Sequence, residues 1–564
     1  MSIVSLYEDY IFNPTTNNAY ATNFWNIIPR KMNDIGHILQ RNFQESDNFD
    51  ENVLSELKNI IIKTHKSFGV LNSEINELLN NWDVKHRTIE IGHQPLYMGG
   101  GSFILNKLSF ALGLNNFLNT NQTLKHNTIF FIGDHDQVQN ELTVTRFPQF
   151  QSASGLELKT EYDNIYQTTP IAHMPIPEER DLLSQFQKIR INYKELFKFT
   201  KIKGHSRSLL EERLEQALNL LYDCYLSSNT YSDWIGKFWA KLFIIYNKSP
   251  LFILKSTDEQ LQKLMLPHFE HLLVEENRID FINILNENYY KIEAEGYKPG
   301  IPIREKNSVP FFYVCLECTG KNRVKLITTG NTLEGYCPSC KEKIIIDYNA
   351  KNPDFSDIYR NLSPRVETRA IIVNKLLNSV IRVTGGGETA YHAQLIPYFK
   401  FKKQNPPLIL KNPRIYYNTP WSEKIASEIN FDELIPLQNP DMFKNMSIIS
   451  KSTDFESLKN IILVNKEIIN TKLKKFEEKE SNYREILTNK NDKEVKRKLD
   501  LVQLYLSHSF GKYQPDKSIQ EVSWNWLDLG VLTGLNDIVG FYNRRLKPET
   551  PIASTYWLSL GQYN

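Results

Sequence analysis

Residues 87–136 read RTIEIGHQPLYMGGGSFILNKLSFALGLNNFLNTNQTLKHNTIFFIGDHD. The stretch begins with a short run typical of a strand, Arg87–Gly92, and continues through a glycine-rich turn into an apolar helical segment, Phe103–Leu118. A second strand-like run, Thr128–Gly133, follows. A strand, a helix and another strand in this order form the repeating element of a parallel, doubly wound sheet. The stretch therefore predicts an α/β fold.

Further buried strands are predicted at Pro250–Leu254, Ser379–Thr384 and Pro407–Leu410. Long insertions separate them, and one, at about 180–246, has leucines and charges at helical spacing. The sheet is thus assembled from distant pieces. We divide the chain into an N-terminal helical region (1–85), the first part of the α/β core (86–300), a cysteine-bearing segment (301–350), the second part of the core (351–445), an arm (450–520) and a C-terminal helical segment (521–564).

The composition is that of an ordinary globular protein, with 41% hydrophobic and 23% charged residues among 564. A formal net charge of +2 lacks the basic excess with which most proteins bind nucleic acid, so we expect small-molecule substrates. The sequence contains no apolar run of about 18 residues and no basic flank leading into an apolar stretch at its start. We therefore expect a cytoplasmic protein with neither a membrane nor a nucleic-acid partner.

The arm at 450–520 is rich in Lys, Glu, Asn, Ile and Leu. Apolar residues recur there every seven positions, at Phe455, Ile462, Ile469, Phe476 and Tyr483, which is one seam of a coiled coil. Polar residues interrupt the second seam. Two interpretations follow: a coiled coil that makes a homodimer, or an antiparallel helical hairpin within one chain.

Four of the five cysteines fall within 26 residues, as Cys315-x-x-Cys318, 18 further residues and Cys337-x-x-Cys340. Two such pairs can present four thiolates tetrahedrally, and strand-like residues flank each pair, as in a zinc ribbon. Four free thiols or an oxidised redox pair are the alternatives. Because four cysteine ligands leave no open position, we predict a structural zinc ion rather than a catalytic one.

The first strand ends in Gly92-His93-Gln94-Pro95, and Gly99-Gly100-Gly101-Ser102 and Lys107 follow. Glycines at this place let a ligand approach the backbone, and free N–H groups at a helix start attract anions. His93 could bind a phosphate or act as an acid–base group. The alternative is a tight turn whose glycines serve packing alone.

The second strand ends in Gly133-Asp134-His135-Asp136. Open α/β sheets bind ligands outside the carboxyl ends of their strands. Two carboxylates that flank an imidazole can orient it, raise its basicity or hold a metal. A capping and turn cluster is the alternative, because Asp is a common helix N-cap.

A later strand ends in Gly385-Gly386-Gly387-Glu388, with Tyr391 and His392 about one turn farther on. Glu388 could accept a substrate amine, and Tyr391 could hydrogen-bond a hydroxyl. The segment could equally be a glycine turn with a first-turn Glu favoured by the helix dipole.

Taken together, these motifs resemble the cysteine-adding enzyme family of bacillithiol biosynthesis. Gly92, Gln94, Gly100 and Lys107 fall in register with the family's G-Q-Q-x-G-x-x-x-G-P-x-x-x-x-x-K stretch, with His93 at its first Gln. Other matches are Asp134-His135-Asp136 to E-D-H-D, Gly296-Tyr297-Lys298-Pro299 to G-Y-K-P, Thr368-Arg369 to a T-R pair before a helix, and Gly385, Gly387, Glu388 and Tyr391 to G-P-G-E-x-x-Y. Their order holds over roughly residues 86–430.

The resemblance implies a Rossmann-like core akin to class I aminoacyl-tRNA synthetases and a coiled-coil arm that dimerises. It also implies a reaction, the joining of cysteine through its carboxyl group to the amine of the amino-sugar conjugate glucosaminyl malate. The family has a small metal-free β element where this chain has its cysteines. From the motifs and the resemblance together, the candidate binding residues are Gly92, His93, Gln94, Gly100, Lys107, Arg369, Gly385, Gly387 and Tyr391, and the candidate catalytic residues are Asp134, His135, Asp136 and Glu388.

Amide formation from a carboxylate needs an activated acyl group, commonly an adenylate or an acyl phosphate, so ATP or ADP is a candidate cofactor. The turns after Gly92 and Gly385 suit anions. His135, held between Asp134 and Asp136, is the candidate to deprotonate the incoming ammonium. The three strand ends can form one pocket only if their strands are parallel neighbours in one sheet.

Two other functions fit the sequence. One is a nucleotide-dependent transferase that uses another amino acid or acceptor. The other is a non-catalytic zinc-ribbon protein that binds tRNA or another RNA, which a basic, aromatic-bearing ribbon face would favour. The cysteine-bearing segment carries some positive charge, at Lys321, Arg323, Lys325, Lys341 and Lys343, although surface lysines are usually just solvated.

Overall fold

The computed structural model describes residues 31–42, 49–198 apart from 123, 138 and 153, 206–428, and 520–549, together with Pro29, Leu501, Leu504, His508, Ile552 and 555–559. The predicted arm at 450–520 lies outside these residues, except for Leu501, Leu504, His508 and Gln520. None of the helices in the described part is long and apolar enough to cross a membrane.

The helices are α3 (Met32–Asn42), α4 (Glu51–Phe68), α5 (Ser73–Asn81), α6 (Phe103–Asn121), α7 (Asn140–Thr143), α8 (Glu179–Lys198), α9 (Arg207–Leu226), α10 (Tyr231–Ala240), α11 (Glu259–Leu273), α12 (Glu275–Ala294), α13 (Val366–Leu376), α14 (Gly386–Phe401), α15 (Pro420–Glu428), α20 (Gln520–Ser523), α21 (Leu527–Thr533) and α22 (Ile538–Asn543). Two small sheets stand apart from the main ones. They pair β3 (Val144–Phe147) with β4 (Leu156–Lys159) and β13 (Arg414–Asn418) with β14 (Thr555–Ser559).

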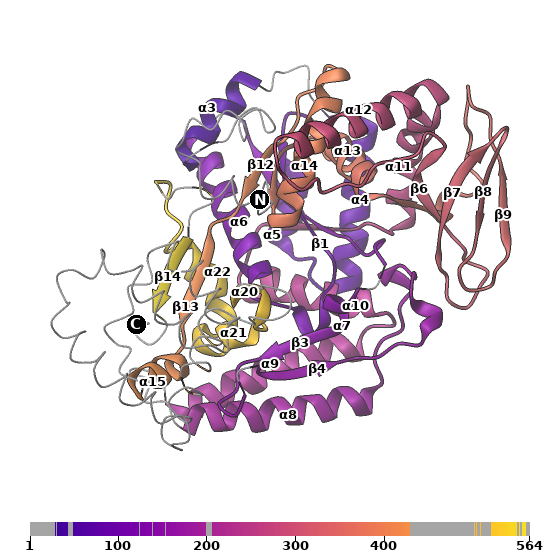
Figure 1. Cartoon of the computed structure of the whole chain (residues 1–564). Helices are drawn as coiled ribbons and strands as arrows, with labels where there is room; N and C mark the ends of the chain where they lie inside the picture. Colours follow the sequence, from indigo (N-terminus) through magenta and orange to yellow (C-terminus); the bar gives the residue numbers. More distant parts are fainter. Residues whose placement is uncertain are drawn as a thin grey trace.

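A five-stranded parallel sheet forms the centre of the fold, with helices packed around it (Figure 1). Its strands, in spatial order, are β12 (Leu408–Lys411), β11 (Ser379–Thr384), β1 (Arg87–His93), β2 (His126–Ile132) and β5 (Leu251–Lys255). Every residue of β2 and β11 is buried. Strands covered on both faces are expected to consist mainly of apolar residues. Short runs of this kind in the sequence predict these strands. The predicted α/β fold with a parallel sheet is confirmed.

The order of the strands places a topological switch point at the centre of the sheet. From β1 the chain moves outward through β2 to β5, and it later returns to the other side of β1 to form β11 and β12. Ile91 pairs with Phe130 on one side and with Val383 on the other, so the three strands run in register to the same edge. Ligands of open α/β sheets bind at such a point, outside the carboxyl ends of the strands.

A second sheet is antiparallel and bears the cysteines. Its order is β10 (Leu362–Pro364), β6 (Ser308–Val314), β7 (Arg323–Thr329), β8 (Thr332–Tyr336) and β9 (Lys343–Asp347). In Figure 1 it stands at the right of the molecule, with β9 outermost. We call it the cysteine-bearing sheet. Because β10 comes from the chain just before α13, this sheet extends beyond residues 301–350 and is joined directly to the core.

Candidate functional site at the sheet edge

The three motifs that follow β1, β2 and β11 meet at one edge of the parallel sheet. As the sequence required, the strands are parallel neighbours. Backbone contacts tie the strand ends together, since the Gly133 amide donates to the His93 carbonyl at 2.8 Å and the Ser256 amide, just past β5, donates to the Ile132 carbonyl at 3.0 Å. The edge therefore gathers side chains from residues far apart in the sequence.

His135 is held by a serine that the sequence did not single out. Its Nδ1 lies 2.8 Å from Ser256 Oγ, and that hydroxyl lies 2.7 Å from Asp134 Oδ1. The serine has one proton, which it donates to the carboxylate, so Nδ1–H of the imidazole donates to the serine oxygen. This assigns the basic lone pair to Nε2. In the described part of the chain, buried Nε2 has no hydrogen-bond partner.

The free nitrogen of His135 faces Asp136. Nε2 lies 3.6 Å from Asp136 Oδ1, and the Asp136 side chain is 24% exposed. Burial lowers the pKa of His135 to about 4 in spite of the opposing charge of Asp136, so the imidazole is neutral at neutral pH. A neutral imidazole with an unpartnered nitrogen can take a proton from a bound group.

Asp136 collects contacts from three parts of the chain. Its Oδ2 accepts a hydrogen bond from Gln94 Nε2 at 2.9 Å, and Arg323 Nη1 lies 3.7 Å from Oδ1. Burial opposes ionisation, but the neighbouring His135, the charges of Arg369 and Arg323 and the Gln94 hydrogen bond hold the pKa of Asp136 below its usual value. Asp136 is therefore an ionised carboxylate at the mouth of the site.

Asp134 does not flank the imidazole, which corrects the expectation from the sequence. Its carboxylate is fully buried and turns toward β5 and α10, where it accepts hydrogen bonds from Ser256, from Ser232 Oγ at 2.8 Å and from the Thr257 amide at 3.1 Å. Lys255 Nζ is 3.6 Å away. Asp134 thus anchors the loop and orients His135 only through Ser256.

Lys107 and Glu388 form an ion pair across the switch point. Lys107 Nζ lies 2.5 Å from Glu388 Oε2 and donates to the Gly92 carbonyl at 2.9 Å. The same carboxylate oxygen accepts the Gly385 amide at 2.7 Å. Burial would raise the pKa of Glu388, but Lys107, Arg369 and these hydrogen bonds lower it to about 2. The pair fixes the β1 and β11 ends relative to each other, so neither side chain is a free charge.

Arg369 and Tyr391 lie beside this pair. Arg369 Nη2 donates to the Tyr391 hydroxyl at 2.8 Å. A Cβ built on Gly133 would lie 3.5 Å from Arg369 Nη1, and one built on Gly92 would lie 3.9 Å from it. The guanidinium therefore covers the glycine ends of β1 and β2, and in the described part it forms no ion pair with a carboxylate.

The His93 ring is neutral and packs against aromatic side chains at the edge of the site. Its ring packs edge-on against Phe103 at 5.0 Å and Trp239 at 6.4 Å between centroids. Nδ1 is 2.7 Å from the Gln94 carbonyl, and burial, followed by the charge of Lys107, lowers the pKa of His93 to about 4. A neutral ring does not supply the positive charge that phosphate binding favours.

The glycine turn Gly99–Gly101 is closely packed, as the second interpretation of this turn expects. Cβ atoms built on Gly99 and Gly100 would meet Trp526 at 2.7 Å and Leu96 at 2.5 Å. The Gly100 carbonyl accepts the Trp526 amide at 2.9 Å. The C-terminal segment thus fills the turn. Gly387 differs, since a Cβ there would meet nothing within 4 Å, so the first turn of α14 is open.

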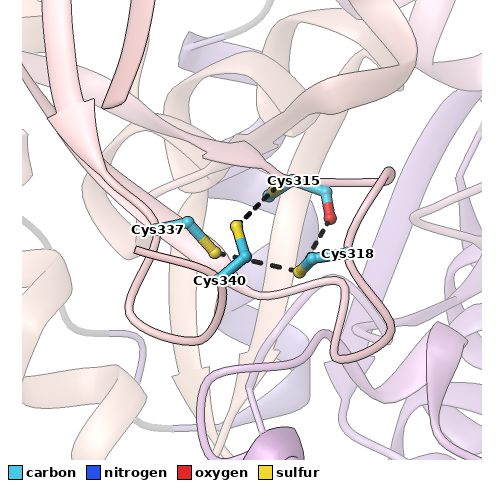
Figure 2. Close-up of side chains that lie close together, drawn as sticks. All are labelled: Cys315, Cys318, Cys337 and Cys340. Carbon is cyan, nitrogen blue, oxygen red and sulfur yellow. Dashed lines mark hydrogen bonds between the residues drawn. The ribbon is translucent and has the colours of Figure 1, made fainter. Parts of the chain in front are cut away.

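The four clustered cysteines converge at one end of the cysteine-bearing sheet (Figure 2). Their Sγ atoms all lie within 4.8 Å of one another. Sγ of Cys315 and Cys340 are 3.9 Å apart, and those of Cys318 and Cys337 are 3.8 Å apart. Sulfurs around a tetrahedral zinc with Zn–S bonds of about 2.3 Å lie about 3.8 Å apart. The cluster is therefore positioned to bind a metal ion of this kind.

Sequence reasoning missed Ser256, Arg323 and Arg365. Ser256 follows the predicted strand Pro250–Leu254, and the rule that ligands lie at carboxyl strand ends would have pointed to it. Arg323 opens β7 and Arg365 directly precedes α13. No local pattern marks either one, because they reach the site through the docking of the antiparallel sheet.

Residues 5–414 match the family described as "Bacillithiol biosynthesis BshC, N-terminal Rossmann-like domain". A protein of Staphylococcus aureus named "Putative cysteine ligase BshC" is 23% identical over 353 residues, which cover 62% of this chain and 58% of that protein. One of the same name from Christiangramia forsetii is 29% identical over 192 residues, covering 33% and 31%. The chain thus spans less than two thirds of either relative's length. Because the family match takes in most of the chain and all the strand-end motifs, the chain belongs to the BshC family.

Proposed function

We propose that this chain is a cysteine ligase that joins the carboxyl group of cysteine to the amine of a glucosaminyl-malate-like acceptor. Both named relatives are called cysteine ligases, which supports the choice of reaction. The acceptor comes from the family resemblance of the strand-end motifs.

The observation that carries the proposal is the orphaned Nε2 of His135. This atom is a buried acceptor without a hydrogen-bond partner in the described residues, and it sits opposite the ionised Asp136. Unsatisfied buried polar atoms are uncommon in folded proteins, and a catalytic role is one explanation for them. At His135 this explanation is supported by the carboxylate opposite the atom. An ammonium group would satisfy both atoms, donating to Nε2 and pairing with the carboxylate.

Each neighbour has a role in the proposed step. The acceptor ammonium gives one proton to His135 Nε2, and the resulting amine attacks the activated cysteine carbonyl. The nitrogen gives its second surplus proton to the departing oxygen as the amide forms. The new C–N bond replaces the C–O bond to the leaving group, which departs with its electron pair. Gln94 holds Asp136 in place, and the pair Lys107–Glu388 keeps the strand ends aligned. ATP, as the source of an acyl adenylate or acyl phosphate, is the proposed activating cofactor.

We also propose that the cysteine cluster holds one structural Zn²⁺. The sulfur spacings fit a tetrahedral S₄ site, and four protein ligands leave no position for a substrate. The ion would contribute no step of the chemistry. It would fasten the loops 315–318 and 337–340 at the end of the sheet.

The test is a product assay with the full chain. The purified protein is incubated with cysteine, glucosaminyl malate and MgATP, and the mixture is analysed by mass spectrometry for the amide. Serine in place of cysteine, and malate without the sugar amine, are the matched controls. We expect the amide only with cysteine and the amino sugar. Product with another amine but none with glucosaminyl malate would make the chain a transferase with a different acceptor.

A further inference from the structure

Cationic side chains outnumber carboxylates where the cysteine-bearing sheet meets the strand ends. The carboxylates there already have cationic partners: Glu388 with Lys107, Glu90 with Arg382, Glu367 with Arg304, and Asp136 with Arg323. Arg365 and Arg369 remain without an ion pair in the described part of the chain. Arg369 at least donates to the Tyr391 hydroxyl. Arg365 is therefore the exceptional group.

Arg365 is buried and incompletely bonded. Its side chain belongs to a residue that is 4% exposed, and its Nε and Nη2 have no hydrogen-bond partner among the described residues. Burial and then the neighbouring charge of Arg304 lower its pKa to about 10, which still leaves it charged at neutral pH. A buried charge without a partner is strongly unfavourable, so a fold that keeps one has a use for it.

Nearby acidic groups cannot serve as the missing partner. Glu367 is engaged by both nitrogens of Arg304, at 2.8 and 3.0 Å. Asp136 is shared by Gln94, His135 and Arg323. Among the described residues, the positive charge of Arg365 is thus left without an anionic partner.

A second guanidinium packs on the same aromatic ring as Arg365. Arg323 lies 4.0 Å above the Phe312 ring and Arg365 lies 4.7 Å from the same ring centroid. Arg323 Nη2 donates to the Pro364 carbonyl at 3.4 Å, and its Nε is also buried without a partner. Two guanidiniums fixed on one aromatic ring, both with unused donors, are the donor set that planar carboxylates and phosphates prefer.

This pair of arginines adjoins the reactive loop. Arg323 contacts Asp136, and Ser363, two residues before Arg365, donates to the His135 carbonyl at 3.2 Å. Arg365 also stands at the N-terminus of α13, an end that favours negative charge. Arg369 follows one turn later on the same face of the helix.

We propose that Arg323 and Arg365 form an oxyanion subsite that binds a carboxylate of the amine acceptor and so places its amine near His135. That the carboxylate belongs to the acceptor rests on the proposed function. The subsite itself follows from Arg365, which has no ion pair among the described residues, and from the unused Nε donor of Arg323. Two backbone contacts hold this end of β7 in place: the Arg323 amide donates to the Thr168 carbonyl at 3.0 Å, and the Cys315 amide donates to the Asn322 carbonyl at 3.0 Å.

The experiment compares anion binding to the full chain and to three variants. Arg365→Met and Arg323→Met remove the proposed charges and keep side-chain length. Arg360→Met is the matched control, because Arg360 is a nearby arginine with an exposed side chain paired to Glu259 on the surface. Malate and, separately, inorganic phosphate are titrated by calorimetry, and thermal unfolding is followed with and without each anion.

We expect malate to bind the wild type and Arg360→Met equally, and each of the other variants at least about tenfold more weakly, the scale of losing one charge-assisted pair. Without anion, Arg365→Met should unfold at the same temperature as the wild type or higher, since it removes an unpaired buried charge. If Arg365 only stabilised the fold, Arg365→Met should unfold at a lower temperature than the wild type.

Other results would overturn the proposal. Unchanged malate affinity in Arg365→Met would do so, as would binding of phosphate but not malate to the wild type. If Arg365→Met does not fold, unchanged malate affinity in Arg323→Met would overturn it instead. Malate binding lost in these variants without any ligation by the wild type would refute the proposed function alone. If the wild type ligates cysteine but malate binds Arg323→Met and Arg365→Met as tightly as the wild type, the subsite alone would be refuted.

Discussion

Asp134 and Asp136 are two residues apart and perform opposite tasks. The turn that follows β2 points one carboxylate into the packed side of β5 and α10 and the other toward the edge of the sheet. The sequence D-H-D indicated a site at this strand end but could not show which carboxylate faces it. That depends on Ser256 and Ser232, which arrive from other strands and helices.

Replacing the two carboxylates should therefore have different effects. We predict that Asp134→Asn lowers the free energy of unfolding by about 2–4 kcal/mol, because a buried carboxylate that accepts several hydrogen bonds is replaced by a neutral amide. Asp136→Asn should unfold within a few degrees of the wild type and ligate cysteine at least about tenfold more slowly. Denaturant unfolding and the product assay measure the two effects. Equal stability of the two variants would contradict the assignment.

Glu388 gives a prediction with a defined pH range. Its pKa is about 2 in the folded chain, below the ordinary value of 4.5. A depressed carboxyl pKa stabilises the fold fully above about pH 4.5, and this stabilisation is lost as the pH falls toward 2. Glu388→Gln should cost about 3 kcal/mol at pH 7, partly because Lys107 is left buried without its partner.

At acid pH, Glu388→Gln should become as stable as the wild type. The difference in unfolding free energy between Glu388→Gln and the wild type should shrink steadily below pH 4.5, as far as the fold allows measurement. Urea unfolding at a series of pH values measures this difference. A constant difference from pH 7 to pH 3 would show that the carboxylate charge is not what stabilises the wild type.

At the scale of elements, the parallel strands were predictable and the antiparallel sheet only in part. Strands β2 and β11 are rich in β-branched and apolar residues, and a glycine follows each of them, so both their position and their carboxyl ends can be read from the sequence. The short strand β10 has no such pattern. Its pairing with β6 is visible only once the two sheets have docked, and this pairing brings Arg365 to the site.

Metal content tests the cysteine cluster. We predict one equivalent of zinc per chain in protein purified without chelator. Cys340→Ser should lower zinc content and the unfolding temperature together, because metal binding and local folding are coupled. Cys224→Ser is the matched control, since this cysteine is buried in α9 outside the cluster. Less than about half an equivalent of zinc in the wild type would count against the site.

At the scale of the whole molecule, the order of the motifs predicted where the site lies. Contacts between residues far apart in the sequence could not be predicted. The three strand-end motifs occur in an order that a doubly wound sheet brings to one edge, so the place of the site could be predicted. The packing of the glycine turn could not, because Trp526, which packs against Gly99, lies in the C-terminal segment. The sequence alone does not distinguish a glycine that makes room for a ligand from a glycine that makes room for a packed tryptophan.

The arm at 450–520 carries the prediction about assembly. We propose that it makes a homodimer through the seam from Phe455 to Tyr483. The double substitution Ile462→Asp and Ile469→Asp would then bury charge in the seam. We expect this variant to be monomeric in sedimentation at micromolar concentration. Lys474→Asp is the control, since it changes charge at a position outside both seams. A wild type that is already monomeric would make the arm an intramolecular hairpin.

The central claim is that the unpartnered nitrogen of His135 receives the proton of the acceptor amine. The most direct measurement is the rate of amide formation by His135→Gln beside the wild type and His86→Gln, a histidine that pairs with Asp83 away from the site. With all three proteins shown to be folded by circular dichroism, we predict at least about a tenfold loss for His135→Gln alone. A His135→Gln enzyme as fast as the wild type would contradict the account.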